Sequence, residues 1–337
     1  MSEQIESAWR LEGISPRAYQ HPADRAATAA LAKVPYLDEV VRRLIAIGYE
    51  RALRAASLGA SVKLGQEQLP HVWVLQRQVY NALDMERVPD LYLTQFPVAN
   101  AYAIGTKQPI VIVNSEIIRL LDDEGRRVVL AHEAAHVHSD HVLYRTALLI
   151  LLMIGASARL PIFAGLPLLA IRLALLEWSR AAELSCDRAA ALVTRDPQAV
   201  CRALMTISAG EAADMLNLDA FIVQGMEYSE TGTGLERLTR LMQDLNVTHP
   251  MPVRRVRMLL DWVREGEYDR MVRGEYLRRG EEPSTREEAD AASAFYGDRI
   301  GGAIQSAGGS VSEVSQQFAE WLRRTTDRGT DGPEPTE

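Results

Sequence analysis

The segment His132-Glu133-Ala134-Ala135-His136 carries the strongest structural signal in this sequence of 337 residues. On an α-helix, residues four apart lie on one face, so both imidazoles can reach one metal ion. Glu133 then lies beside that ion as a candidate base for its bound water. Asp122 or Asp123 can cap the start of the helix, and no Gly or Pro follows between Val128 and Leu152.

A third ligand narrows the chemistry of this ion. A metzincin would need Gly at position 139 and His at position 142, where this sequence has Ser139 and Val142, so that class is excluded. Glu183 and Asp187 lie four apart in a run of helix formers and share one face of a second helix. Two His from one helix and a Glu from another form a His₂Glu catalytic zinc site, with the fourth position left for water. Asp187 could then accept a hydrogen bond from the outer nitrogen of one ligating His.

Simpler interpretations stay open for parts of this pattern. The two carboxylates could form a solvated helix face, salt-bridged to Arg180 and Arg188, and the motif histidines could be ordinary core or surface residues. His138 and His141 lie two and five residues beyond His136. On a continuing helix both point away from the ligand face, so we interpret them as flanking polar positions.

At this point the chain resembles the HtpX-like and CAAX-prenyl-protease-like gluzincin metallopeptidases. Four segments match in order: Asn100-Ala101-Tyr102-Ala103, His132 to His136, Glu183 to Asp187, and Thr248-His249-Pro250 followed by Arg254 and Arg255. Tyr102 stands where Phe is commoner in the family, and Cys186 stands where Ala is usual. Together the segments cover roughly residues 70 to 275.

The resemblance implies a role for each residue of the two central motifs. One Zn²⁺ per chain would be bound by His132, His136 and Glu183, and Asp187 would orient His132. Glu133 would act as general base and then as general acid. The implied function is a zinc-dependent endopeptidase that hydrolyses peptide bonds through a zinc-bound water activated by Glu133. Its partner would be a peptide or protein substrate.

The resemblance also implies two contacts with substrate. Asn100, Ala101, Tyr102 and Ala103 would form an edge strand against which substrate lies extended, a mode that reads backbone before side chains. His249 would be a catalytic residue that helps to stabilise the tetrahedral oxyanion. An isolated His before Pro is as often a turn residue, so both interpretations of His249 stay open.

Composition limits the partners and the compartment. The net charge is −8, and no Lys/Arg-rich run interleaves with aromatic residues, so nucleic acid is not an expected partner. Cys186 and Cys201 form no spaced metal motif or disulfide framework; they suit a reducing compartment and are expected to be buried. The N-terminus has no basic start and no apolar core, so we expect no signal peptide. We therefore expect a location in the cytoplasm or at the cytoplasmic face of a membrane.

The apolar segment 146–178 could either pack in the protein core or contact a membrane. Its two uncharged runs, broken at Arg159-Leu160-Pro161, are each shorter than the roughly 20 apolar residues that span a bilayer. If the zinc helix continues to Ala158, its end lies about 33 Å beyond His136, which is far enough to dip into a membrane. We favour a helical hairpin packed against other helices, with peripheral membrane contact as the alternative.

The whole pattern predicts an α+β fold, mostly helical, of the zincin-like gluzincin type. Strand signals at 91–94, 101–104 and 110–113 predict a small antiparallel sheet beside the zinc helix. The expected regions are N-terminal helices (1–69), the metallopeptidase domain with its apolar helical hairpin (70–278), a C-terminal helical extension (279–324) and a disordered tail (325–337). Oligomeric state is not determined by the sequence.

Two functions from other classes compete with the peptidase. One is a catalytically inactive metallopeptidase fold that acts as a scaffold or holdase and docks through its apolar hairpin. The presence of every catalytic residue type argues against it. The other is a closed structural zinc site, which usually has four protein ligands, mostly Cys and His, whereas only three ligands are expected to converge here.

Overall fold

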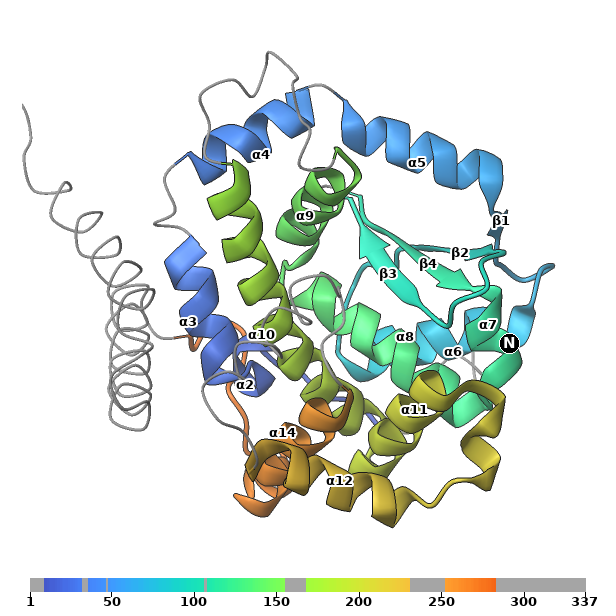
Figure 1. The fold of residues 1–337 in the computed structure, drawn as a ribbon, viewed down its shortest axis with the longest axis vertical. Helices are drawn as coiled ribbons and strands as arrows, with labels where there is room; N and C mark the ends of the chain where they lie inside the picture. The colour runs from blue at the N-terminus through green and yellow to red at the C-terminus, as the bar shows by residue number, and fades with distance from the viewer. Residues whose placement is uncertain are drawn as a thin grey trace, which may run out of the picture.

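The computed structural model describes residues 9–31, 36–46, 48–105, 108–154, 168–230 and 252–282. Helices make up most of this part of the chain, with a single small sheet at one side (Figure 1). The N-terminal helices are α2 (Pro16–Tyr19), α3 (Pro22–Leu31), α4 (Leu37–Ala46) and α5 (Tyr49–Ala60). Helices α6 (Pro70–Ala82), α7 (Ser115–Leu120), α8 (Asp123–His138), α9 (Val142–Ile154) and α10 (Leu168–Thr194) follow. After α10 come α11 (Pro197–Ala209), the 3₁₀ helix η2 (Gly210–Met215), α12 (Leu218–Glu230), α14 (Pro252–Arg264) and α15 (Glu267–Val272).

The sheet is mixed, which corrects the antiparallel sheet expected from the sequence. Its strands are β1 (Val62–Lys63), β2 (Asp90–Thr94), β3 (Ala101–Ile104) and β4 (Ile110–Asn114), in the order β1-β2-β4-β3. β3 and β4 pair antiparallel, but β4 lies between β2 and β3 and runs parallel to β2. The physical reason is that the chain leaving β2 passes beyond the place of β4 before it turns back as β3. The short strand β1 falls in a region where only helices were expected.

Side chains on the two faces of the sheet enter different clusters. Leu91, Val111 and Val113 face a large core that they share with α6 and α8, whereas Tyr92 and Ile112 face Leu149 of α9. This alternation is what the period of two along a strand requires. The large core also includes residues of the N-terminal segment and of α14, which are Leu11, Ile14, Tyr19, Val256, Leu259 and Trp262.

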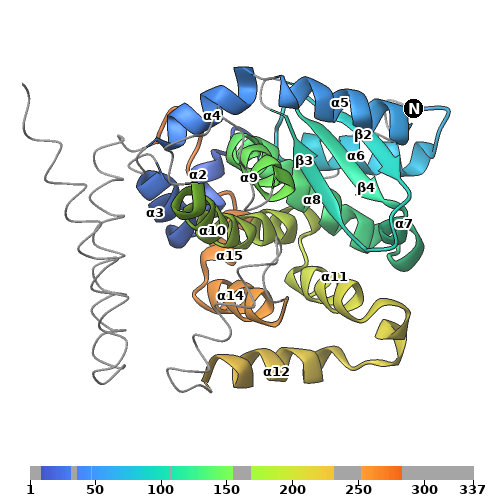
Figure 2. The same ribbon diagram turned by 45° about the horizontal axis from the view of Figure 1, so that its top comes forward.

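Helices α8 and α10 cross at the centre of the molecule, beside β3 (Figure 1). Asp122 caps α8 by accepting a hydrogen bond from the backbone N–H of Gly125 at 2.8 Å, as the sequence predicted. Turning the molecule shows α4 and α5 on one side of this crossing and α11, α12 and α14 on the other (Figure 2). Most side chains of α8 and α10 at this crossing are buried.

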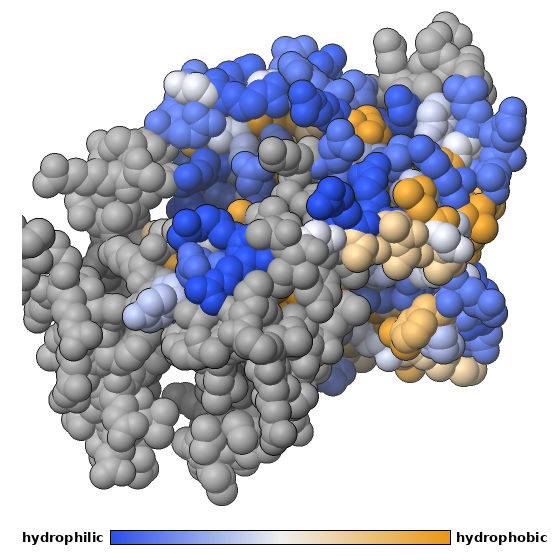
Figure 3. All heavy atoms as spheres, turned by 90° about the horizontal axis from the view of Figure 1, so that it is seen from above, coloured by the Kyte–Doolittle hydropathy of each residue, from blue (hydrophilic) through white to orange (hydrophobic). Residues whose placement is uncertain are grey.

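The predicted apolar segment contributes to a second core. Side chains of α9 and α10 pack against α3 and α4, with Leu148, Leu151, Leu175 and Trp178 among the buried members. The turn of the predicted hairpin lies outside the described residues. No helix in the described part of the chain combines the length and the apolar character needed to cross a membrane. The face above α4 and α5 is mostly hydrophilic where it is coloured, with apolar side chains in small separate groups (Figure 3).

Helix α8, which carries the His-Glu-x-x-His motif, is shorter than the continuous helix considered from the sequence. α8 ends at His138, and α9 begins at Val142 after a turn. Asp140 in that turn has a left-handed backbone, with φ of 56°. The predictions for Gly232-Thr233-Gly234, for the C-terminal extension and for the tail lie outside the described residues.

Candidate metal centre

The α8 helix brings both motif histidines and Glu133 to one buried place. His132, Glu133 and His136 are 7 %, 2 % and 0 % exposed. The helix is held there because Leu130, Ala131 and Ala134 on its surface enter the large core. Buried polar side chains are costly unless they are paired or bind a ligand, so this cluster requires a chemical explanation.

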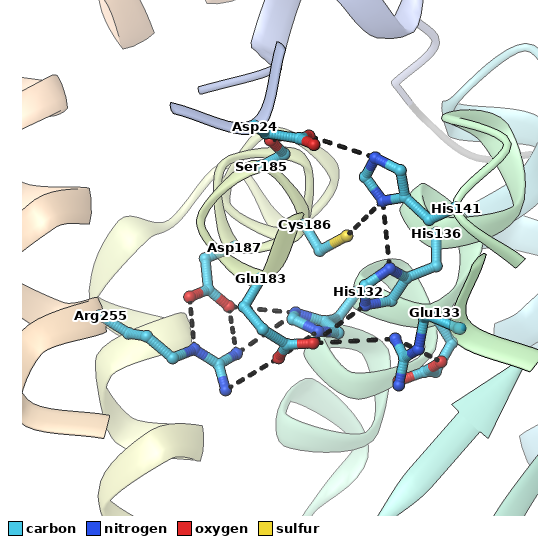
Figure 4. A network of polar contacts seen from close by, with 11 residues as sticks. Asp24, His132, Glu133, His136, His141, Glu183, Ser185, Cys186, Asp187 and Arg255 are labelled. Carbon is cyan, nitrogen blue, oxygen red and sulfur yellow. Dashed lines mark hydrogen bonds and ion pairs between the residues drawn. The ribbon is translucent and has the colours of Figure 1, made fainter. Parts of the chain in front are cut away.

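Helix α10 supplies Glu183 opposite both histidines (Figure 4). Its Oε2 lies 3.2 Å from His132 Nε2, and its Oε1 lies 3.3 Å from His136 Nε2. A tetrahedral ion with ligand bonds near 2.0–2.1 Å would hold neighbouring ligand atoms about 3.3 Å apart. The spacing of the three side chains thus fits an ion bound among them.

The protonation of His136 supports the same interpretation. Burial, followed by the nearby charge of Arg145, lowers the pKa of His136 well below its usual value, so the ring is neutral near pH 7. Its Nε2 makes no hydrogen bond among the described residues, and the nearest carboxylate oxygen is that of Glu183. If the ring proton is on Nδ1, the Nε2 lone pair faces the Glu183 carboxylate, an arrangement that is repulsive unless a cation lies between them.

The site as a whole favours positive charge near His132. Burial acts to lower the pKa of His132, but the carboxylates of Glu183 and Asp187 outweigh it and raise the pKa to about 9. Asp187 Oδ1 lies 3.0 Å from His132 Nδ1, on the side of the ring away from Glu183. Nδ1–H can therefore donate to Asp187 while Nε2 is directed toward the ion, the arrangement expected of a ligating His with its carboxylate partner.

Arg255 of α14 holds Asp187 in place. Its Nε donates to Asp187 Oδ2 at 2.7 Å and its Nη2 to Oδ1 at 2.5 Å, while Nη1 lies 3.3 Å from Glu183 Oε2. Burial acts to raise the pKa of Asp187, but Arg255 and His132 lower it below its usual value. In the sequence, Arg255 was noted only as part of the segment that follows Thr248-His249-Pro250. Its pairing with Asp187 was not anticipated, because the two residues lie 68 positions apart in the chain.

Arg145 of α9 is a second buried cation that the sequence analysis missed. Its Nη1 lies 3.7 Å from Glu133 Oε2 and 3.8 Å from Glu183 Oε1, and its side chain is 10 % exposed. Nothing in the motif signals this residue, because the turn after α8 decides where α9 points. Its charge offsets part of the negative charge of the two carboxylates.

His141 corrects the interpretation that both trailing histidines are flanking polar positions. It is 2 % exposed, and its Nδ1 lies 3.2 Å from His136 Nδ1. The reason is the end of α8: His141 N–H donates to His136 C=O at 2.9 Å, and Asp140 N–H donates to Val137 C=O at 3.3 Å. This is a Schellman motif, which folds the residue after the left-handed position back over the last helical turn. His138 instead contacts the hydroxyl of Tyr19 at 2.9 Å.

Cys186 is a further donor near the histidines. The ligand atoms of His132, His136 and Cys186 lie within 4.8 Å of one another, and the thiol is buried. Burial raises the pKa of the Cys186 thiol well above its usual value. We favour Glu183 as the third ligand because it meets both Nε2 atoms at 3.2–3.3 Å, whereas Cys186 Sγ makes a 4.0 Å contact with His141. Cys201 is also free and buried, as predicted.

The strand expected to align substrate lies at the edge of the sheet. Ala101, Tyr102 and Ala103 belong to β3, the last strand in the sheet order, and α8 packs beside it. Asn100 precedes the strand and accepts, through its carbonyl, a hydrogen bond from Asn114 N–H at 2.9 Å. His249 lies outside the described residues, so its predicted catalytic role has no structural account here.

Comparison with known proteins agrees with this geometry. The model of peptidase family M48 matches residues 72–263, which include both α8 and the Glu183 region of α10. The chain belongs to peptidase family M48. Its relatives make it an HtpX-like metalloprotease, which acts on peptide or protein substrates and depends on a metal.

Two relatives illustrate the extent of the similarity. A plastoglobule-localized metallopeptidase 48 of the chloroplast of Arabidopsis thaliana is 36% identical over 260 residues, which cover 76% of this M48 chain and 75% of the relative. A protease HtpX homolog of Burkholderia multivorans is 30% identical over 208 residues, which cover 54% of this chain and 70% of the relative. No solved structure gave a significant match to the chain.

Proposed function

We propose that this metalloprotease is a zinc-dependent endopeptidase of the gluzincin type, in which His132, His136 and Glu183 hold the ion. The observation that carries the proposal is the convergence of these side chains from α8 and α10, at 3.2 and 3.3 Å between facing ligand atoms. Imidazole nitrogen and carboxylate oxygen form a donor set that suits zinc. Three protein ligands leave one position for water, as in catalytic rather than structural zinc sites.

Glu133 would be the general base and acid. When bound, zinc lowers the pKa of a coordinated water to about 7 and polarises the substrate carbonyl. The Glu133 carboxylate and that of Glu183 lie near the same Arg145 Nη1, at 3.7 and 3.8 Å, which supports a role at the edge of the same site. Glu133 would accept the proton of the attacking water and then deliver it to the leaving amine. Arg145 lies near enough to keep the Glu133 carboxylate oriented toward the centre.

Asp187 and Arg255 would serve the ion indirectly. Asp187 accepts from the outer nitrogen of His132 and thereby fixes which nitrogen is free to bind metal. Arg255 fixes the carboxylate in turn through two charged hydrogen bonds. This arrangement explains why a carboxylate is needed one helical turn after Glu183.

The edge strand β3 would align the substrate. An extended peptide added beside residues 100–103 would lie along α8, with its backbone paired to the strand. We infer an endopeptidase because the edge strand would recognise backbone in the middle of a substrate chain, and no feature among the described residues selects a substrate terminus. His249 would add an oxyanion contact if it reaches the site.

Metal removal and restoration test the proposal. We expect 1,10-phenanthroline followed by dialysis to abolish casein hydrolysis, and about one equivalent of Zn²⁺ per chain to restore it. Hydrolysis that persists in the stripped protein would contradict a metal-dependent mechanism. Stoichiometric zinc without hydrolysis of casein or of unfolded protein substrates would instead favour the scaffold alternative.

A further inference from the structure

The second histidine ligand has its own chain of buried partners, separate from the one that holds His132. His141, carried back over α8 by the Schellman turn, faces His136 Nδ1 with its own Nδ1 at 3.2 Å. The opposite ring nitrogen, His141 Nε2, lies 3.1 Å from Asp24 Oδ2. Asp24 belongs to α3 and is 0 % exposed. Figure 4 shows the three side chains in a line that leads from the metal centre toward α3.

One assignment of protons is compatible with both contacts of His141. If His136 presents Nε2 to the ion, its Nδ1 carries the proton and donates to His141 Nδ1. His141 must then carry its own proton on Nε2, the nitrogen that lies 3.1 Å from Asp24 Oδ2 as an ion-pair contact. The reverse assignment at His141 would place two N–H groups face to face and turn an unprotonated ring nitrogen toward the Asp24 carboxylate. The geometry therefore links the charge of Asp24 to the ring orientation of His136.

Several hydrogen bonds fix the Asp24 carboxylate, so that it can influence His136 through His141. The hydroxyl of Ser185 donates to its Oδ2 at 2.6 Å, and that hydroxyl in turn accepts from the backbone N–H of His21 at 2.9 Å. Thr28 lies one helical turn further along α3, with its hydroxyl 3.4 Å from Asp24 Oδ1. Burial acts to raise the pKa of Asp24, but the interactions with His141, Ser185 and Thr28 lower it below its usual value. The carboxylate is thus charged and fixed.

The ring of His141 is fixed as well. Trp178 of α10 packs edge-on against it, with ring centroids 5.4 Å apart and planes at 88°. Trp178 Nε1–H donates to Thr28 Oγ1 at 2.9 Å, which ties α3 and α10 together beside the line of polar contacts. Cys186 Sγ, at 4.0 Å from His141 Nδ1, is too distant to compete strongly for the same nitrogen.

We propose that Asp24 and His141 are positioning residues that orient His136 for metal binding, through the line Asp24–His141–His136. The inference rests on the proposed function, since it assumes that His136 binds the ion. In this proposal the Asp24–His141 pair orients the ring of His136, as Asp187 orients the ring of His132. One half of the metal centre then depends on an N-terminal helix that lies before the matched residues 72–263.

Zinc affinity of the full chain, measured by chelator competition, tests this role without reference to turnover. Outer partners of metal-ligating His typically contribute 10–100-fold in affinity, so we expect Asp24→Ala and His141→Phe each to weaken zinc binding by about 10–100-fold. Asp24→Asn keeps an acceptor oxygen at the same place and should restore most of that loss. Thr194→Val is the control: it removes a part-buried hydroxyl that bonds to backbone groups at the end of α10, such as Ala190 C=O at 2.9 Å, and should leave zinc affinity unchanged.

Nitrogen-15 NMR of the zinc-loaded wild type gives a second test that needs no variant. With histidines labelled, we expect His136 to carry its proton on Nδ1 and His141 on Nε2. The opposite tautomer at His141 would overturn the proposal. So would zinc affinities of Asp24→Ala and His141→Phe equal to wild type, with changes only in thermal stability. A wild-type chain that binds no zinc would instead refute the proposed function itself.

Discussion

Replacement of Arg255 by Met should destabilise the protein strongly even when no metal is bound. The side chain of Arg255 is 9 % exposed, that of Asp187 is 3 % exposed, and the two are joined by two hydrogen bonds at 2.7 and 2.5 Å. Removing one member of a buried pair leaves an uncompensated charge, which typically costs 3–5 kcal/mol. For a protein of this size we therefore expect the melting temperature to fall by about 10 °C.

A double-mutant cycle separates this effect from lost packing. Asp187→Asn in the Arg255→Met background removes the unpaired charge. The loss in free energy of unfolding of the double variant should therefore be smaller, by about 1–3 kcal/mol, than the sum of the losses of the two single variants. The assay is urea unfolding followed by circular dichroism in the presence of a chelator, because metal binding would otherwise mask the difference.

A control on the same helix makes the comparison specific. Arg264 of α14 pairs with Asp261 at 3.1 Å, but its side chain is 57% exposed. Arg264→Met should change the free energy of unfolding by less than about 0.5 kcal/mol. An Arg255→Met variant as stable as Arg264→Met, or strictly additive effects in the cycle, would refute the account of the buried pair.

Two other perturbations follow from the same contacts. Glu183→Gln should lose stoichiometric zinc while Cys186→Ser keeps it; metal analysis showing the reverse would make the thiol the third ligand. Asp84 accepts from Gly13 N–H at 2.7 Å and pairs with Arg10 and Arg279, which lower its pKa despite the opposing effect of burial. A lowered carboxyl pKa stabilises the fold above the usual value of 3.8, and this contribution is lost as pH falls through the folded-state pKa. Asp84→Asn should thus lower the free energy of unfolding by about 1 kcal/mol near pH 7, after allowance for solvent screening. In thermal melts the difference between variant and wild type should shrink below pH 3.8. A difference that is constant with pH would exclude the carboxylate charge as its source.

Local periodicity explains what the sequence could predict. Residues four apart on a regular helix share a face, which is why His132 and His136 could be expected on one face of α8, and Glu183 and Asp187 on one face of α10. That these two faces meet was implied by the family resemblance and not by spacing. The strands from 90 to 114 were expected within a residue of their observed bounds, because short runs with aromatic and β-branched residues between turn residues are distinctive.

What could not be predicted depends on where helices end and on long-range contacts. The face of His141 was assigned on a continuing helix, but a left-handed Asp140 ends α8 and redirects the next residue. Asp24 meets His141 only because α3 packs on α10, and nothing in the sequence near either residue indicates that contact. The parallel pairing of β2 with β4 likewise depends on the path of a loop and not on the strands themselves.

The comparison of purified wild type with Glu133→Gln tests the central claim most directly. Zinc content and casein hydrolysis would be measured side by side on the same preparations. The account predicts about one zinc per chain in both proteins and cleavage by the wild type alone, because the amide keeps the site but cannot accept a proton. Near-normal cleavage by Glu133→Gln would contradict the assignment of Glu133 as the base.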